Sequence, residues 1–166
     1  MTSPLDALVE LGNERLIFSL EFVLRPNAWR DHQDQWGLRW SRPRRWNPQA
    51  PARIPKSSGI YAFSLIPDAP GVPPGEYVLY VGKAESQTLA QRYQQYVREA
   101  AGAAGTRIHI YNMFKRWGGQ LWYRCALVSS ADVDDAERAI RAALEPPMNR
   151  DFSIDLNAAA RAFGRL

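Results

Sequence analysis

The chain has 166 residues, which is enough for one domain with a substantial hydrophobic core. Its hydrophobic content of 46% is that of an ordinary soluble globular protein, and the lack of any long apolar run argues against a membrane protein. The formal net charge of +4 at pH 7 is compatible with a polyanionic partner, although many basic proteins bind no nucleic acid.

Cysteine and histidine are too scarce to form a metal site of their own. Cys125 is the single cysteine, which excludes a disulfide within the chain and a zinc site built from cysteines. His32 and His109 stand far apart in the sequence, which argues against a histidine-built metal site. The N-terminal sequence TSPLDALVEL has neither a basic start nor an apolar signal core, so we expect a cytoplasmic protein.

The first 55 residues are predicted to form an N-terminal extension. A short helix is expected at its start, where Ser3 can cap the first turn and Gly12 can end the last. The alternation of apolar residues over Arg15–Leu24 then predicts a strand.

Residues 25–56 differ in composition from the rest of the chain. Seven arginines and one lysine against two aspartates give this segment a local charge of +6. Prolines in its second half exclude a long helix there. The basic residues alternate with four tryptophans, Trp29, Trp36, Trp40 and Trp46.

Two interpretations fit this segment. In the first it is an arm that contacts nucleic acid, and Arg42, Arg44 and Arg45 bind phosphates without reading the base sequence. In the second its tryptophans pack into the domain and its arginines are solvated. We favour core packing for the tryptophans, and we expect the segment to lie near the functional site because it leads directly into the next strand.

Two strands are predicted at Ser58–Leu65 and Glu76–Gly82, joined by a loop rich in proline and glycine, and we expect them to pair antiparallel. They carry Tyr61 and Tyr80, and Lys83 follows the second strand. A phenol ionises near pH 10 unless a neighbouring cation lowers its pKa. A lysine close by is therefore what a tyrosine would need to act as a base near neutral pH.

Helices are predicted over Leu89–Ala101 and Thr106–Trp117 from their apolar stripes. In the first helix Arg92 and Tyr96 are four residues apart and lie on one edge of the stripe. Arginine can grip a phosphate with two hydrogen bonds and stays protonated, although a lone helical arginine is more often solvated. The apolar run Leu121–Val128 predicts a third strand, expected at the centre of the sheet.

The last strongly periodic helix has a carboxylate within its apolar face. Val133, Ile140 and Leu144 have the spacing of one buried face, and Glu137 occupies the remaining position of that face. A carboxylate in such a place is costly unless it is paired or bound to a metal. The alternative is that Glu137 lies at the edge of the stripe, where the dipole of the first helical turns favours a negative charge.

Together these segments resemble the GIY-YIG nuclease family over Lys56–Asn149. The matching motifs occur in the family's order and spacing: Gly59-Ile60-Tyr61, Tyr80-Val81-Gly82, Arg92 with Tyr96 after it, and Glu137 followed by Pro147 and Asn149. The fold expected is α+β, with a small three-stranded antiparallel sheet flanked by helices over residues 56–150. A C-terminal tail helix is expected over residues 151–166.

The resemblance implies a metal-dependent endonuclease that acts on nucleic acid, with DNA favoured over RNA as the substrate. The implied site residues are Tyr61, Tyr80, Lys83, Arg92, Tyr96, Glu137 and Asn149. In that family the glutamate holds a single divalent metal, here Mg²⁺ or Mn²⁺, and the asparagine helps to shape the site. We expect Arg92 to stabilise charge on the phosphoryl oxygens. Tyr61, in preference to Tyr80, would take the proton from the attacking water.

Two alternatives to this function remain open in the sequence. The chain could be a catalytically silent domain that only binds nucleic acid or a protein partner. It could also be a nuclease that stays inactive until a partner supplies the target. A stripe-breaking carboxylate at Glu137 argues against the silent domain, because a binding module has no need of one.

Overall fold

The computed structural model describes residues 22–49, 53–66 and 75–149, and the structural statements below concern this part of the chain. The predicted N-terminal helix, most of the predicted strand Arg15–Leu24, most of the loop between the tyrosine strands, and the tail helix lie outside it. Residues 22–24, the described end of that predicted strand, adopt no regular structure.

The described elements form one antiparallel sheet with helices on both faces. The strand order is β1-β4-β2-β3, with β1 at Arg44–Arg45, β2 at Gly59–Leu65, β3 at Tyr77–Ala84 and β4 at Leu121–Leu127. The α+β class is confirmed, but the prediction of three strands is wrong because the short β1 adds a fourth. Of the three long strands it is β2, and not the predicted last strand, that lies in the middle, although β4 is also an inner strand because it pairs with β1 on one side and β2 on the other.

Four helices pack on this sheet within the described ranges. The predicted helices are found as α3 (Leu89–Ala100), α4 (Ile108–Trp117) and α5 (Val133–Leu144). The helix α2 (Pro26–Trp36) was not predicted, because His32 is its only buried residue and it has no strong apolar stripe. Its signals were Pro26 in the first turn and Gly37, which ends the helix in the left-handed region at φ 50°.

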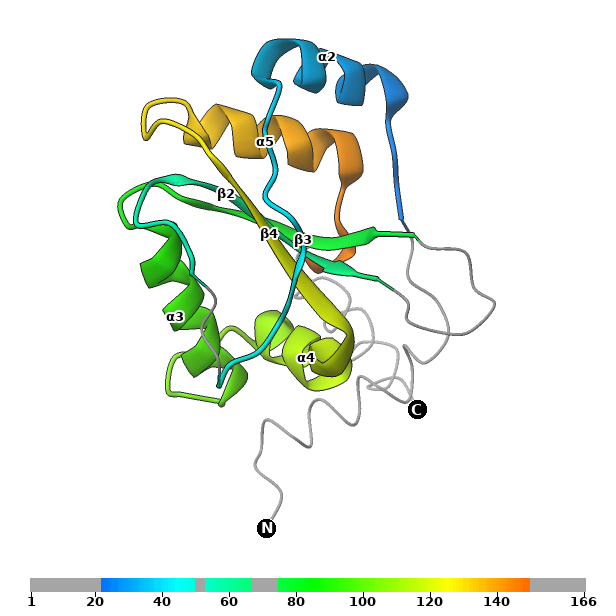
Figure 1. The fold of residues 1–166 in the computed structure, drawn as a ribbon. Coiled ribbons are helices and arrows are strands. Elements are labelled where there is room, and N and C mark those ends of the chain that lie inside the picture. The colour runs from blue at the N-terminus through cyan, green and yellow to red at the C-terminus, as the bar shows by residue number, and fades with distance from the viewer. Residues whose placement is uncertain (1–21, 50–52, 67–74, 150–166) are drawn as a thin grey trace, which may run out of the picture.

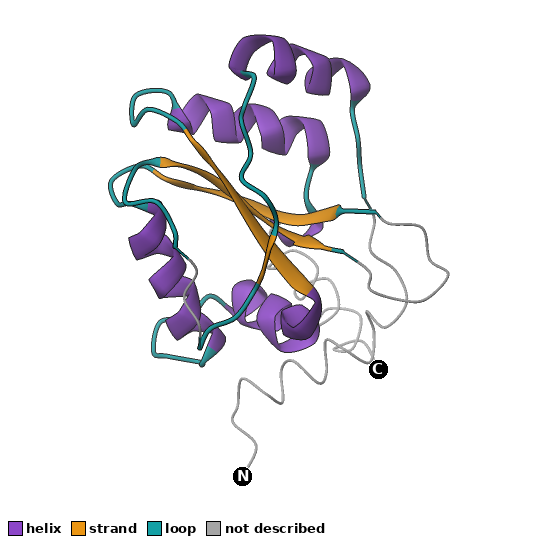
Figure 2. Cartoon of the chain, viewed as in Figure 1, coloured by secondary structure: helices purple, strands orange, loops and turns teal. Residues whose placement is uncertain are grey.

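The helices form two layers, one on each face of the sheet. As Figures 1 and 2 show, α2 and α5 lie together on one face, and α3 and α4 cover the other. Alternation along β2 divides the core accordingly: Ile60 and Ala62 pack with Val133 and Ile140, whereas Tyr61 and its neighbours on the same side pack toward α3 and α4.

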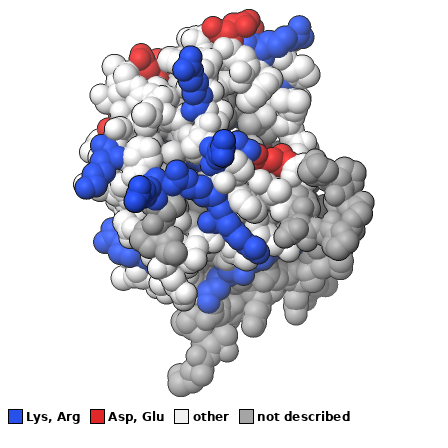
Figure 3. Space-filling model, viewed as in Figure 1, with Lys and Arg blue, Asp and Glu red and all other residues white. Residues whose placement is uncertain are grey.

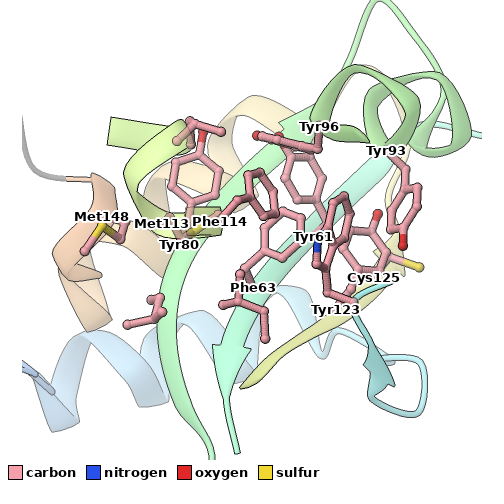
Figure 4. Close-up of a cluster of buried hydrophobic side chains, with 14 of the residues drawn as sticks. Tyr61, Phe63, Tyr80, Tyr93, Tyr96, Met113, Phe114, Tyr123, Cys125 and Met148 are labelled. Carbon is pink, nitrogen blue, oxygen red and sulfur yellow. The ribbon is translucent and has the colours of Figure 1, made fainter. Parts of the chain in front are cut away.

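The layer between the sheet and α3/α4 is a dense aromatic core (Figure 4). Tyr61 lies 5.5 Å from Tyr96 and 5.9 Å from Tyr123, measured between ring centroids. Trp46 stacks on Phe114 at 4.6 Å. These contacts fix the Tyr61 ring from several sides, so its hydroxyl has a defined position.

Three of the four tryptophans of the basic segment pack into the core, as we favoured. Trp46 is buried in the aromatic core, and Trp36 and Trp40 pack against the opposite core below α5. Cys125 is also buried, and burial raises the pKa of its thiol, as expected for a small core residue. None of the helices in the described part of the chain combines the length and apolar character needed to cross a bilayer.

Candidate active site

A polar pocket of about 470 Å³ opens at the β3 edge of the sheet, between α3 and α5. It brings together five of the seven predicted site residues from four different elements. Tyr61, Tyr80, Lys83, Arg92 and Glu137 line it, together with Gly82, Glu85, Ser86, Gln87, Asp134 and Arg141. Tyr96 and Asn149 do not line this pocket. Tyr96 contacts the pocket residue Tyr61, and Asn149 contacts Val81, which lies between the pocket residues Tyr80 and Gly82.

A glycine lets the Tyr61 side chain reach this edge. Tyr61 pairs with Gly82 across β2 and β3, and its ring crosses directly over that glycine. A Cβ atom added to Gly82 would overlap the Tyr61 phenol. Position 82 therefore has to be glycine because the Tyr61 ring approaches its Cα so closely.

The Tyr61 hydroxyl belongs to a buried hydrogen-bond network. It lies 2.7 Å from the Tyr96 hydroxyl and accepts a hydrogen bond of 3.0 Å from Nε of Arg92. Burial raises the pKa of Tyr61 to about 12, although Arg92 acts in the opposite direction. The phenol is thus protonated at neutral pH in the protein alone.

Lys83 does not have the role that we expected for it beside Tyr61. Its Nζ forms an ion pair with Asp134 on α5 and donates a 2.9 Å hydrogen bond to Glu85. Because side chains alternate along a strand, Lys83 points toward α5, away from the aromatic face that holds Tyr61. The cation that contacts the Tyr61 phenol is Arg92 instead.

Helix α3 holds Arg92 in a fixed orientation. Thr88 begins the helix with a capping box: its hydroxyl accepts a hydrogen bond from the Gln91 amide, and the Gln91 side chain accepts one from the Thr88 amide. Nη1 of Arg92 donates to Gln95 at 2.7 Å, and the guanidinium lies over the Tyr96 ring at 5.2 Å. Arg92 lines the pocket, and its Nη2 has no hydrogen-bond partner within the described residues, so the N–H groups of Nη2 are available to a ligand there.

Tyr80 is the second tyrosine of the pocket and is largely buried. Its hydroxyl lies 3.5 Å from Nη1 of Arg107, the residue just before α4. Its ring lies 6.4 Å from that of Tyr61, so the two phenols share one wall of the pocket.

Glu137 occupies the position in the apolar face of α5 that the periodicity indicated. Val133 and Ile140 are buried beside it, and Glu137 itself is only 8% exposed. Burial raises the pKa of the Glu137 carboxyl, while Arg141 and then Lys83 lower it. Oε1 accepts a 3.3 Å hydrogen bond from Arg141, and Oε2 accepts none among the residues described.

Few residues of the pocket can act as metal ligands. No group of three or more His, Cys, Asp or Glu residues is arranged to hold an ion in the described part of the chain. Asp134 is engaged by Lys83 and Arg138, which leaves the unoccupied oxygen of Glu137 as the best single ligand. One carboxylate facing a polar pocket fits Mg²⁺, which usually keeps several waters and needs few protein ligands.

Asn149 acts from outside the pocket by holding the edge strand. Its Oδ1 accepts a hydrogen bond from the Val81 amide and its Nδ2 donates to the Val81 carbonyl, both at 2.7 Å. Val81 lies between Tyr80 and Gly82, so this pair of bonds fixes the segment of β3 that forms the pocket wall. The side chain also lines an adjoining pocket that Arg141 shares.

The three arginines predicted to bind phosphate lie elsewhere. Arg44 and Arg45 form β1, the edge opposite β3, and two strands separate them from the pocket wall. Nη1 of Arg44 donates to the Arg53 carbonyl and Nη2 of Arg45 to the Gly119 carbonyl, each at 2.7 Å. Arg42 is exposed nearby. Arg42, Arg44 and Arg45 therefore do not border the pocket, although Lys and Arg side chains do gather on the face shown in Figure 3. The end of the segment does reach the helix that carries Arg92, because the Ala90 amide donates to the Pro55 carbonyl at 3.1 Å.

Sequence reasoning missed two arginines at the site. Arg141 lies four residues after Glu137, a spacing that places the two side chains together on a helix and could have been noticed. Arg107 approaches Tyr80 only through the packing of α4 on α3, which no local spacing reveals.

Comparison of the chain with protein-family models, with curated proteins and with solved structures found no match. The function of the pocket therefore has to be inferred from its own residues.

Proposed function

We propose that the protein is a metal-dependent endonuclease of the GIY-YIG type that hydrolyses phosphodiester bonds, in DNA rather than RNA. The observation that supports this most is that β2, α3 and α5 contribute Tyr61, Arg92 and Glu137 to the same open pocket. Phosphodiester hydrolysis needs three things that these side chains can supply: a group that handles the proton of water, a fixed cation and a metal ligand.

Glu137 would hold the divalent ion through its unoccupied oxygen, with water and substrate oxygens completing the shell. Bound Mg²⁺ or Mn²⁺ supplies Lewis-acid stabilisation of charge on the phosphate. The Arg141 contact to the other oxygen holds the Glu137 side chain in place.

Arg92 would bind a non-bridging phosphate oxygen through Nη2, because its other donors are held by Gln95 and Tyr61. A guanidinium fixed by two neighbours needs no rearrangement when negative charge builds up in the transition state. The position of the guanidinium over the Tyr96 ring further restricts the conformations of the Arg92 side chain.

Tyr61 remains our choice for the group that accepts the proton of the attacking water, and Tyr80 the alternative. With a pKa of about 12, only a small fraction of Tyr61 is ionised at neutral pH. Cleavage that depends on the Tyr61 phenolate should therefore become about tenfold faster with each pH unit between about 7 and 10.

The test uses the full chain with supercoiled, linear and single-stranded DNA and with RNA, each in Mg²⁺, in Mn²⁺ and with EDTA. Glu137→Ala and Glu137→Gln should abolish cleavage and should also abolish Mn²⁺ binding measured by calorimetry. Asp135→Asn is the matched control, because Asp135 is an exposed carboxylate on the same helix that pairs with Arg138.

Failure of the wild-type protein to cut any substrate in either metal would overturn the proposal in this form. DNA binding without cleavage would then favour a silent binding module. Cleavage that appears only with an added partner protein would favour a partner-dependent nuclease.

A further inference from the structure

Arg107 contacts the pocket residue Tyr80 without lining the pocket itself. We propose that Arg107 is a positioning residue of the active site, which holds the Tyr80 hydroxyl in place through Nη1. This role rests on the proposed nuclease function.

The guanidinium of Arg107 contacts Glu99 and two tyrosines, Tyr80 and Tyr96. Nε and Nη2 bind the two carboxylate oxygens of Glu99 at 3.3 and 3.0 Å, which is a bidentate pair. Nη1 is 3.5 Å from the Tyr80 hydroxyl. Because the guanidinium is planar and rigid, fixing Nε and Nη2 on Glu99 also fixes the direction of Nη1.

Arg107 is arranged around Tyr96 in the same way as Arg92. The guanidinium carbon lies 5.2 Å from the Tyr96 ring centroid for Arg92 and 5.5 Å for Arg107. Tyr96 is fully buried, so it gives both arginines a rigid support.

Each arginine then reaches a different tyrosine of the pocket. Arg92 donates to Tyr61 at 3.0 Å, and Arg107 approaches Tyr80. The looser second contact is of the kind that tightens when substrate binds. The structure thus pairs each candidate base with its own cation, and the pairing of Tyr80 was not apparent from the sequence.

Glu99 completes this arrangement from α3. Its side chain is 16% exposed, and it accepts hydrogen bonds from the two Arg107 nitrogens that do not contact Tyr80. Loss of Glu99 should therefore release Nη1 from its direction while leaving the positive charge in place.

Other ionisable groups also lie near Tyr80 and must stay unchanged in the kinetic test. From the neighbouring elements and the pocket these are Tyr61, Lys83, Glu85, Arg92, Tyr96, Glu99, Asp134, Glu137 and Arg141.

The kinetic test is a double-mutant cycle on cleavage with Arg107→Gln, Tyr80→Phe and the double variant. Arg107→Gln should lower kcat about tenfold with KM for DNA unchanged, which is the loss expected for one charge-assisted hydrogen bond. Arg107→Gln should have no further effect in the Tyr80→Phe background. Arg107→Lys should recover part of the loss, because it keeps the charge without the planar fork.

Arg116→Gln is the matched control. Arg116 is an α4 arginine that also stacks on an aromatic ring, that of Trp117 at 4.9 Å. Its substitution should leave kcat within about twofold of wild type. An equal loss of kcat for Arg107→Gln in the wild-type and Tyr80→Phe backgrounds would overturn the role of Arg107.

A spectroscopic test separates this proposal from the nuclease function. With tyrosine labelled at the ring carbon Cζ, the Tyr80 resonance at pH 7 should move in Arg107→Gln and in Glu99→Gln, and stay in place in Arg116→Gln. If the protein cleaves no substrate, the nuclease proposal fails while this measurement still tests the contact. An unmoved Tyr80 resonance in Arg107→Gln would show that Arg107 does not position Tyr80.

Discussion

The two edges of the sheet both carry arginines, but in opposite settings. At the β3 edge Arg92 is half-buried, and side chains from β2 and α3 hold its Nε and Nη1. At the β1 edge Arg44 and Arg45 are exposed and donate to backbone carbonyl groups. The same residue type, arginine, is therefore a preorganised cation at the β3 edge and a solvent-exposed surface charge at the β1 edge.

The cause of this difference lies in what packs behind each edge. Tyr96 and the aromatic core support the pocket at β3 from below. The two-residue strand β1 has no comparable layer of side chains holding its arginines within the described residues. We therefore expect chemistry at the β3 edge and, at most, substrate grip at the β1 edge.

The largest effect is expected from Arg92→Ala. Removing the held guanidinium should lower kcat by about 10²–10³-fold, as for other fixed donors that stabilise transition-state charge. Steady-state cleavage at saturating DNA measures this. Arg98→Ala, which changes another arginine of the same helix outside the pocket, should cut at nearly the wild-type rate. A similar loss of kcat in Arg92→Ala and Arg98→Ala would contradict the special role of the hydrogen-bonded Arg92.

Tyr61→Phe should come next, with a loss of about 10²-fold. The rise of rate with pH between about 7 and 10 should also disappear, because the group with a pKa of about 12 is gone. Tyr93→Phe is the control, since Tyr93 is a buried phenol of α3 outside the pocket. If Tyr61→Phe cleaves at the wild-type rate and Tyr80→Phe loses most of its activity, the general base is Tyr80 and not Tyr61.

Gly82→Ala should damage the β3 edge through packing alone. The added methyl group would overlap the Tyr61 phenol, which the aromatic core prevents from moving freely. We expect a loss of about 1–3 kcal/mol in the free energy of unfolding in urea, the usual cost of overpacking. Cleavage should fall as well, since the phenol is displaced from Arg92. Gly119→Ala, where a methyl group would meet open space, is the control for the glycine change itself.

Alkaline pH should destabilise the fold through Tyr61. Its pKa of about 12 in the folded protein exceeds the value near 10 of an unfolded tyrosine. The stabilising contribution is therefore fully present below about pH 10 and is lost as the pH rises from about 10 to 12, by about 2–3 kcal/mol. In urea titrations across this range, Tyr61→Phe should lose correspondingly less stability than wild type. Parallel losses in the two proteins would contradict the assignment.

The smallest effect on rate is expected at the β1 edge. The triple variant Arg42→Ala, Arg44→Ala and Arg45→Ala should bind unrelated DNA sequences similarly weakly. The dependence of log K on log salt should flatten by about two to three units, while kcat changes far less than in Arg92→Ala. An unchanged salt dependence would mean that these arginines only support the fold through their carbonyl contacts.

The sequence by itself determined the local elements around the pocket. Periodicity located α3, α4 and α5 and the long strands, because a helix or strand needs only its own spacing of apolar residues. The same spacing was enough to place Glu137 in the buried face of α5. Residues 26–45 were harder, since α2 and the short β1 are recognised only when α5 and β4 are in place to pack and pair with them.

Only the tertiary structure decided how these elements meet. Strand order put β1 and β3 at opposite edges, which separated Arg44 and Arg45 from the pocket. The tertiary packing also determined three side-chain partners: Lys83 pairs with Asp134, Asn149 with the Val81 backbone and Arg107 with Tyr80. The pKa of Tyr61 was likewise beyond the sequence, because burial by residues distant in the chain outweighs its one cationic neighbour. Contacts and desolvation of this kind depend on three-dimensional proximity, which the spacing of residues along the chain does not encode.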